Sequence, residues 1–81
     1  MSLESTDENL AELASLLRVI ADEKRLRILA LLAHQETCVC DLMERLGLSQ
    51  SLASHHLGVL RRTGLIRARH DAQWVYYSID A

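Results

Sequence analysis

The chain of 81 residues has no proline, no phenylalanine and only three glycines, which argues against long irregular loops. Trp74, Tyr76 and Tyr77 are the only aromatic residues, so a core must be built from aliphatic side chains, as in packed helices. No apolar run approaches the length of a transmembrane helix, and the N-terminus lacks the features of a secretory signal. We therefore expect one cytoplasmic domain, residues 1–81, with no membrane partner and with both cysteines reduced.

Charge is distributed unevenly along the chain, although the net charge is only −2. Residues 1–12 contain four acidic residues and no basic one, whereas residues 45–70 contain five arginines and no acid. A basic half within a mildly acidic protein is the local electrostatic pattern of a nucleic-acid-binding surface.

The first half of the chain predicts three helices. The spacing of Ser5 and Glu8 is that of a capping box, and it predicts the start of the first helix. This helix has two apolar stripes, one of Leu10, Leu13, Leu17 and Ile20 and another of Leu16 and Val19. Because one stripe would stay exposed in a monomer, we expect a homodimer through the first helix. A core helix at 22–33, a turn at 34–37 and a short helix at 40–46 follow.

Residues 47–66 predict a further helix with clear end signals. Ser49 is a good N-cap, and Gly47 and Gly64 suit the left-handed positions that end helices. Leu52, Ala53, His56, Leu57 and Leu60 share one face, on which we expect His56 to be buried and hydrogen-bonded to backbone. The opposite face is polar and becomes basic, which suits the major groove of double-stranded DNA. We expect base contacts from Gln50, Ser51, Ser54 and His55, and phosphate contacts from Arg61 and Arg62.

After Gly64 the pattern predicts two strands, at 65–70 and 73–79, with Trp74 packing the hairpin against the helices. The tip at Asp71 and Ala72 has no glycine, so we expect either a turn longer than the tightest type or one in which Asp71 forms a turn of its own. The predicted fold is mainly α with a small β-hairpin: a winged helix-turn-helix of four helices followed by a two-stranded wing.

These segments together resemble the ArsR/SmtB family of metal-sensing transcriptional repressors. The resemblance rests on ADEKRLRIL (21–29), CVCDL (38–42), LGLSQSLASHHLGVLRRTGLI (46–66) and WVYYSI (74–79). It implies a homodimer that binds operator DNA and releases it when an inducing ion binds. The recognition-helix positions match Gln50, Ser51, Ser54 and His55, and the wing positions match Arg67, Arg69 and Gln73. Family members usually have another helix after the hairpin; this sequence ends at Ala81, so we expect no zinc site of that helix and a dimer that depends on the first helix.

Cys38 and Cys40 are the candidate ligands of the inducing ion. In an extended segment both sulfurs point the same way, whereas in a regular helix they lie on different sides. A soft ion bound by both would therefore favour a non-helical first turn of the third helix and re-aim the helix that follows. Thiolates select soft ions, and two thiolates do not complete a tetrahedral zinc site.

The resemblance is to the arsenic-sensing branch in particular, whose third cysteine is replaced here by Met43. Trivalent arsenic or antimony is the favoured inducer, with a third ligand from outside the chain, and cadmium, lead or zinc is the alternative. A thiol-redox repressor with a strained, easily reduced disulfide is a second hypothesis. A winged-helix protein-interaction module is a third. No acid/base pair, nucleophile–histidine set or phosphate loop indicates an enzyme.

Overall fold

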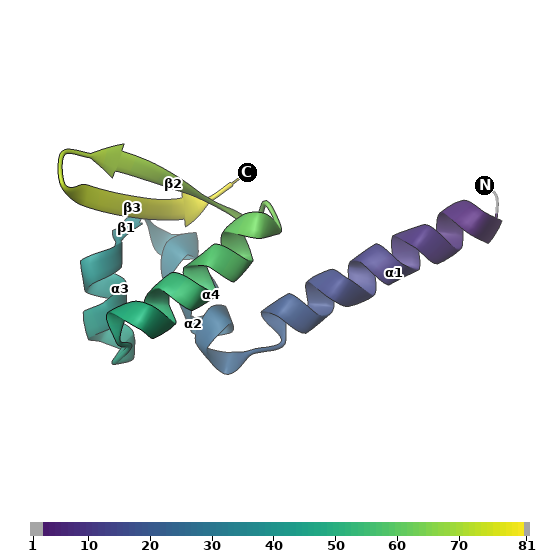
Figure 1. Cartoon of the computed structure of the whole chain (residues 1–81), viewed down its shortest axis with the longest axis horizontal. Coiled ribbons are helices and arrows are strands. Elements are labelled where there is room, and N and C mark those ends of the chain that lie inside the picture. Colours follow the sequence, from purple (N-terminus) through teal and green to yellow (C-terminus); the bar gives the residue numbers. More distant parts are fainter. Residues whose placement is uncertain (1–2, 81) are drawn as a thin grey trace.

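The computed structural model describes residues 3–80 and has the predicted order of elements, with one strand added. Three helices pack together beneath a small antiparallel sheet, while the first helix projects away from them (Figure 1). The elements are α1 (Leu3–Ile20), α2 (Glu23–His34), β1 (Thr37–Cys38), α3 (Val39–Leu46), α4 (Gln50–Arg62), β2 (Ile66–Asp71) and β3 (Trp74–Ile79). The prediction of a winged helix-turn-helix is confirmed.

The core lies where α2, α3, α4 and the sheet meet. Ile28, Leu42 and Leu60 are fully buried, one from each of the three helices, and Ile66 joins them from the first residue of β2. This arrangement is the aliphatic core that the shortage of aromatic residues requires. The second helix is less enclosed than its apolar sequence suggests, because Leu26 is 51% exposed.

Local capping signals set the ends of α3 and α4 as predicted. The hydroxyl of Ser49 accepts the backbone N–H of Leu52 at 3.2 Å, which caps α4. Gly47 (φ 63°) ends α3 and Gly64 (φ 82°) follows α4, both in the left-handed region. These two glycines and one serine therefore fix the length of the helix-turn-helix. The capping prediction for the first helix is wrong, since α1 begins at Leu3 and Ser5 lies inside it.

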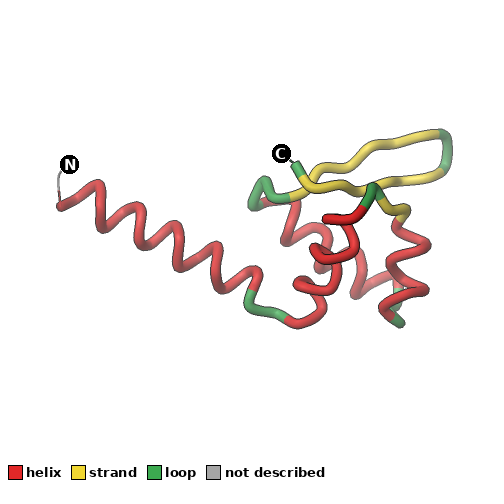
Figure 2. Tube along the Cα trace, turned by 180° about the vertical axis from the view of Figure 1, so that it is seen from behind, coloured by secondary structure: helices red, strands yellow, loops and turns green. Residues whose placement is uncertain are grey.

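The sheet has three strands in the order β1-β3-β2 rather than two (Figure 2). Thr37 pairs with Tyr77 and Cys38 with Tyr76, so residues predicted as the end of a turn form a short strand. The hairpin tip is also tighter than predicted, because Asp71 pairs with Trp74 and only Ala72 and Gln73 connect the strands. Ala72 adopts φ 55°, the left-handed conformation that a two-residue turn requires and that glycine usually supplies.

Trp74 does not pack the hairpin against the helices. It lies at the tip of the wing and is 45% exposed. Its place in the register explains this, because the alternate positions Ile66, Tyr77 and Ile79 face the core. None of the helices described has the length and apolar character that crossing a membrane requires.

Candidate DNA-binding surface and thiol site

The polar face of α4 is open to solvent along its whole length. Gln50, Ser51, Ser54 and His55 are all exposed, as the prediction of base-contacting residues requires. Leu52 was expected to face the core but is 47% exposed, because it lies at the edge of the buried stripe near the start of the helix. The surface that can reach bases is therefore wider and includes one apolar side chain.

His56 is buried on the opposite side of α4, as predicted, with 7% of its surface exposed. Its partner is not backbone but a side chain: Arg25 Nε donates to His56 Nδ1 at 3.1 Å. The same arginine donates from Nη1 to the carbonyl oxygen of Val19 at 3.0 Å. Arg25 therefore connects α1, α2 and α4. Burial lowers the pKa of the His56 imidazole, so this side chain stays neutral and can accept the hydrogen bond.

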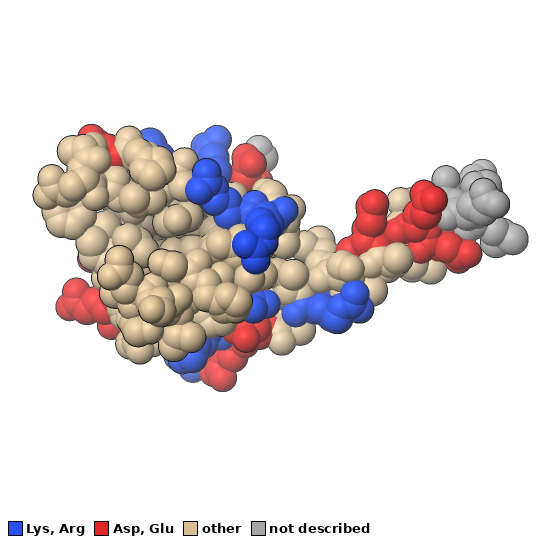
Figure 3. All heavy atoms as spheres, viewed as in Figure 1, with Lys and Arg blue, Asp and Glu red and all other residues tan. Residues whose placement is uncertain are grey.

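Basic side chains gather near the junction of α4 with the hairpin, and acidic ones lie along the outer half of α1 (Figure 3). Arg61, Arg62 and Arg67 are exposed in this region, and Arg67 Nε donates to Ser78 Oγ at 3.4 Å. None of the three forms an ion pair with a carboxylate in the part of the chain that is described. Their guanidinium groups are available to phosphate. Gln73, the last predicted wing residue, is exposed in the turn at the tip.

Arg69 differs from the other predicted wing residues because its charge is already paired. Its Nη2 lies 2.7 Å from Glu36 Oε1 and its Nε 3.1 Å from Glu36 Oε2, and Asp71 is 3.7 Å away. The guanidinium also lies 4.8 Å from the centre of the Tyr76 ring. The hydrogen bonds to Arg69 hold the pKa of Glu36 below its usual value. The predicted role of Arg69 in DNA binding therefore conflicts with an existing contact.

The two cysteines converge at the start of α3. Cys38 Sγ and Cys40 Sγ are 3.0 Å apart, and Cys38 is the N-cap of α3, with its sulfur accepting the backbone N–H of Cys40 at 3.3 Å. Cys40 is exposed and Cys38 half-buried. The hydrogen bond with Cys38 is the main cause that raises the pKa of the Cys40 thiol, and burial and the negative charge of a Cys38 thiolate raise it further. The pair is a dithiol whose sulfurs already face each other.

This geometry corrects the expected mechanism of ion binding. Convergence of the sulfurs does not require an unwound first turn, because Cys38 precedes the helix in an extended conformation while Cys40 lies within α3. A tetrahedral ion with metal–sulfur bonds near 2.3 Å would separate the sulfurs to about 3.8 Å, a widening of under 1 Å. The donor set fits a soft ion held by two sulfurs. No group of three or more His, Cys, Asp or Glu side chains that could hold a metal exists among residues the structure describes.

A groove extends from the first turn of α3 to the polar face of α4. Its volume is about 280 Å³, and it runs between α3, α4 and β3. Val39, which separates the two cysteines, lines it together with Met43, and Gln50, Ser54 and Arg61 line the other side. The first turn of α3 is therefore a direct neighbour of the predicted base- and phosphate-contacting residues.

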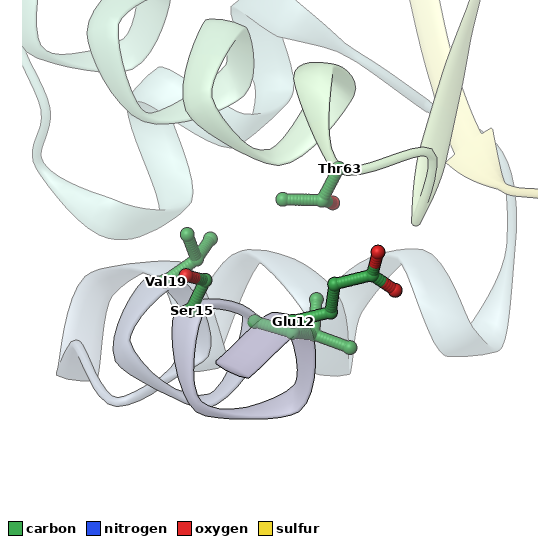
Figure 4. A pocket seen from close by; sticks show the side chains of 5 residues that line it. Glu12, Ser15, Val19 and Thr63 are labelled. Carbon is green, nitrogen blue, oxygen red and sulfur yellow. The ribbon is translucent and has the colours of Figure 1, made fainter. Parts of the chain in front are cut away.

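The first helix leaves one apolar stripe uncovered. Leu10, Leu13 and Leu17 are 58%, 49% and 51% exposed. The other stripe faces the body of the domain, where Leu16 and Val19 line a pocket of about 360 Å³ with Thr63 at the end of α4 (Figure 4). This is the division between an inner and an outer stripe that the sequence predicted.

The fold and the exposed polar face of α4 define a winged helix-turn-helix domain of the kind that transcription regulators use to bind DNA. Residues 22–68 match the family model described as "Bacterial regulatory protein, arsR family". The chain is 43% identical over all 81 residues to the transcriptional activator HlyU of Vibrio cholerae, of which it covers 75%. The chain therefore belongs to the arsR family of bacterial regulatory proteins.

Two further relatives show the range of this family. The arsenical resistance operon repressor of Escherichia coli is 45% identical over 66 residues, which are 80% of this chain and 56% of the repressor. Solved structures agree with the fold: reduced HlyU from Vibrio cholerae has a TM-score of 0.89 at 43% identity, covering 98% of this chain and 83% of that one. A homodimeric winged helix-turn-helix domain from Mycobacterium bovis has a TM-score of 0.86 at 31% identity, covering 100% of this chain and 74% of that one. These relatives are regulators rather than enzymes, as predicted.

The sequence did not predict the roles of three residues, Arg25, Glu36 and Tyr76. Each role depends on a contact with a residue distant in sequence. Arg25 contacts His56, which is 31 positions away, and Arg69 contacts both Glu36, 33 positions away, and Tyr76, seven positions away. Arg25 lies within the ADEKRLRIL motif, which could have singled it out as a site of interest. Nothing in the sequence around Glu36 indicates its partner.

Proposed function

We propose that this protein is a thiol-responsive transcriptional repressor that binds operator DNA as a homodimer and releases it when Cys38 and Cys40 react. The observation that carries the proposal is the 3.0 Å separation of the two sulfurs at the N-terminus of α3. Val39, between the two cysteines, lines the groove that Gln50, Ser54 and Arg61 also line, so a change in the backbone of this segment acts next to the proposed DNA contacts.

DNA binding would use α4 and the adjoining basic surface. The side chains of Gln50, Ser51, Ser54 and His55 suit base edges in the major groove, and Arg61, Arg62 and Arg67 suit the phosphates on either side. Gln73 extends the surface at the tip of the wing. The exposed stripe of α1 would form the dimer contact with a second copy, since three exposed leucines on one helix are best covered by another apolar helix.

The favoured inducer is a soft thiophilic ion, with trivalent arsenic or antimony first and cadmium, lead or zinc as the alternative. Two thiolates suit soft ions, and the similarity to the Escherichia coli arsenical repressor supports arsenic. When bound, such an ion would take electron density from the sulfur of Cys38, and this sulfur would then be a weaker acceptor for the backbone N–H of Cys40 that it now accepts. Weakening this cap would destabilise the first turn of α3, which connects to α4 through Gly47 and Leu48.

A redox response is the second candidate, and the same sulfur geometry supports it. The sulfurs need to approach by about 1 Å to reach the length of a disulfide bond. The similarity to HlyU, one of whose structures is of the reduced protein, extends over the whole chain. In this case a hydroperoxide would oxidise both thiols to a Cys38–Cys40 disulfide and be reduced to an alcohol and water.

The experiment compares arsenite with a hydroperoxide as agents that release DNA from the reduced protein. We expect Cys38→Ser and Cys40→Ser to bind DNA as the wild type does and to lose the response, with Glu44→Gln, an exposed position of α3 outside the proposed DNA contacts, as a control that keeps both thiols. Release by arsenite alone supports the ion, and release by hydroperoxide with a mass loss of two hydrogens supports the disulfide. A double serine variant that still responds to either agent contradicts the proposal.

A further inference from the structure

The outer face of the sheet carries a row of side chains that connects the wing to the cysteine segment. Arg69 pairs with Tyr76 in the register, and Tyr76 pairs with Cys38. Directly paired residues of antiparallel strands share a face. The neighbouring positions Thr37 and Ile66 alternate to the other face and are buried against the helices. Arg69, Tyr76 and Cys38 therefore lie side by side on the face that points away from the core.

Arg69 crosses the central strand on this face. Its guanidinium passes over the Tyr76 ring at 4.8 Å and donates to both carboxylate oxygens of Glu36, from Nη2 at 2.7 Å and from Nε at 3.1 Å. Glu36 directly precedes β1. The contact therefore joins β2 of the wing to the segment that leads into Cys38, across the full width of the sheet.

This contact competes with DNA. A guanidinium that donates from Nε and Nη2 to one carboxylate has used one of its two paired-donor edges, and the carboxylate neutralises the charge that attracts phosphate. Arg61, Arg62 and Arg67 have no carboxylate partner among the side chains described, those of residues 7–80, so Arg69 is the one predicted DNA-binding arginine that is already paired there. Asp71, 3.7 Å from Nη1, adds a second negative charge beside it.

Glu36 is also placed to respond to the cysteines. It lies two residues before Cys38, and β1 joins β3 through only two register pairs, Thr37 with Tyr77 and Cys38 with Tyr76. A strand this short is held to the sheet by few contacts of its own, so a shift of Cys38 on reaction would be passed through Glu36 to Arg69 and would displace the wing.

We propose that Glu36 is a positioning residue: it withholds Arg69 from DNA phosphate in the reduced protein and links the wing to the cysteine pair. The inference rests on the proposed DNA-binding function but not on the identity of the inducer. Glu36 touches neither DNA nor inducer in this scheme and acts only through Arg69.

The test is the salt dependence of binding to a short random-sequence DNA duplex, measured with the full chain. The slope of log Kobs against log salt counts phosphate contacts, at about 0.9 per contact. Glu36→Gln should steepen it by about 0.9 for each protomer that contacts the duplex because Arg69 is freed, while Arg69→Gln alone leaves it unchanged. The double variant should return to the wild-type slope, and Glu36→Asp should keep it. Glu44→Gln is the matched control, because it removes an exposed charge of α3 that has no ion-pair partner among the described residues.

Two results overturn the proposal. A slope that falls by about 0.9 per protomer in Arg69→Gln would mean that Arg69 already contacts phosphate beside Glu36. A slope in Glu36→Gln no steeper than in Glu44→Gln would mean that Glu36 withholds nothing. A wild-type protein that does not bind the duplex contradicts the proposed function itself, and the inference falls with it.

Arsenite and a hydroperoxide, added separately, test the link to the cysteines. The loss of DNA affinity on reaction should be several-fold smaller in Glu36→Gln than in the wild type, because the wing is no longer tied to β1. An equal loss in both proteins contradicts the link. A wild type that responds to neither agent counts against the proposed thiol response, whereas the salt slopes still decide whether Glu36 withholds Arg69.

Discussion

Replacement of His56 by alanine should be among the most damaging single changes to this domain. The side chain is 7% exposed and accepts the hydrogen bond from Arg25 Nε at 3.1 Å. Removal of the imidazole leaves the charged guanidinium of Arg25 without this acceptor, which should lower the free energy of unfolding by about 1.5–3 kcal/mol. The lost packing of the ring raises the expected destabilisation to about 2–4 kcal/mol, a large part of the roughly 5 kcal/mol expected of a small domain.

The same contact predicts a dependence on pH. Burial lowers the pKa of His56 in the folded protein below its unfolded value of about 6.5. Protonation therefore favours the unfolded chain, so the stability from neutral His56 is complete above about pH 6.5 and is lost as pH falls through the folded pKa. Asp22 opposes this shift, while Arg25, Lys24 and His55 reinforce it.

Urea unfolding between pH 5 and 8, at one protein concentration and with reduced thiols, measures both effects. The free energy of unfolding of the wild type should fall toward the acid end of this range. His56→Ala should be less stable at pH 8, and its free energy of unfolding should fall less as the pH is lowered. His56→Gln offers an amide oxygen to Arg25 and should recover part of the loss without the pH dependence. Two results would refute this reasoning. One is a destabilisation by His56→Ala of under about 0.5 kcal/mol at pH 8, which is the range of ordinary surface substitutions. The other is a loss of stability between pH 8 and pH 5 that is as large in His56→Ala as in the wild type.

Three other predictions concern separate parts of the molecule. Leu13→Glu should convert the dimer to a monomer in light scattering without unfolding it, because Leu13 is 49% exposed in the single chain; a dimer of unchanged strength would contradict the role given to α1. Arg61→Ala should flatten the slope of log Kobs against log salt by about 0.9 per protomer, whereas Arg27→Ala, whose charge is paired with Glu23, should leave it unchanged. In thermal unfolding, Gly64→Ala should lower the stability by about 1–2 kcal/mol because the φ of Gly64 is 82°. Ala72→Gly should leave the stability unchanged or raise it, because Ala72 already has a left-handed φ of 55°. A loss of stability in Ala72→Gly would refute this.

The helix-turn-helix could be predicted because its signals are local. Ser49 caps α4 with its own hydroxyl, and Gly47 and Gly64 take the conformations that glycine tolerates best. The periodicity of α4 also identified its buried side. It could not determine how far that side extends, since Leu52 lies at its edge and its exposure depends on where the neighbouring helices end.

The features that escaped prediction depend on contacts between distant residues. β1 is two residues long and exists only because β3 offers Tyr76 and Tyr77 as partners. The basic stretch 45–70 contains no acid, yet the sheet brings Glu36, 33 residues earlier, to Arg69. Charge counted along the sequence therefore overstated the charge that the wing presents to DNA.

The sequence singled out the cysteine pair but did not predict its geometry. The spacing indicated that the sulfurs could meet only if the first turn of α3 were not helical. The structure meets this condition in another way, by placing Cys38 at the N-cap and Cys40 inside the helix. The end of a helix decides this geometry, and sequence patterns locate helix ends only to within a few residues.

The central claim is that reaction at Cys38 and Cys40 controls DNA binding. It is tested most directly by titrating the reduced protein with arsenite, antimonite, cadmium, lead and zinc while thiolate–ion absorption and DNA release are recorded together. The account predicts that at least one soft ion, arsenite first, binds both thiols and releases DNA at the same equivalence point. Saturation of the thiols with all five ions while the protein stays on DNA would contradict it.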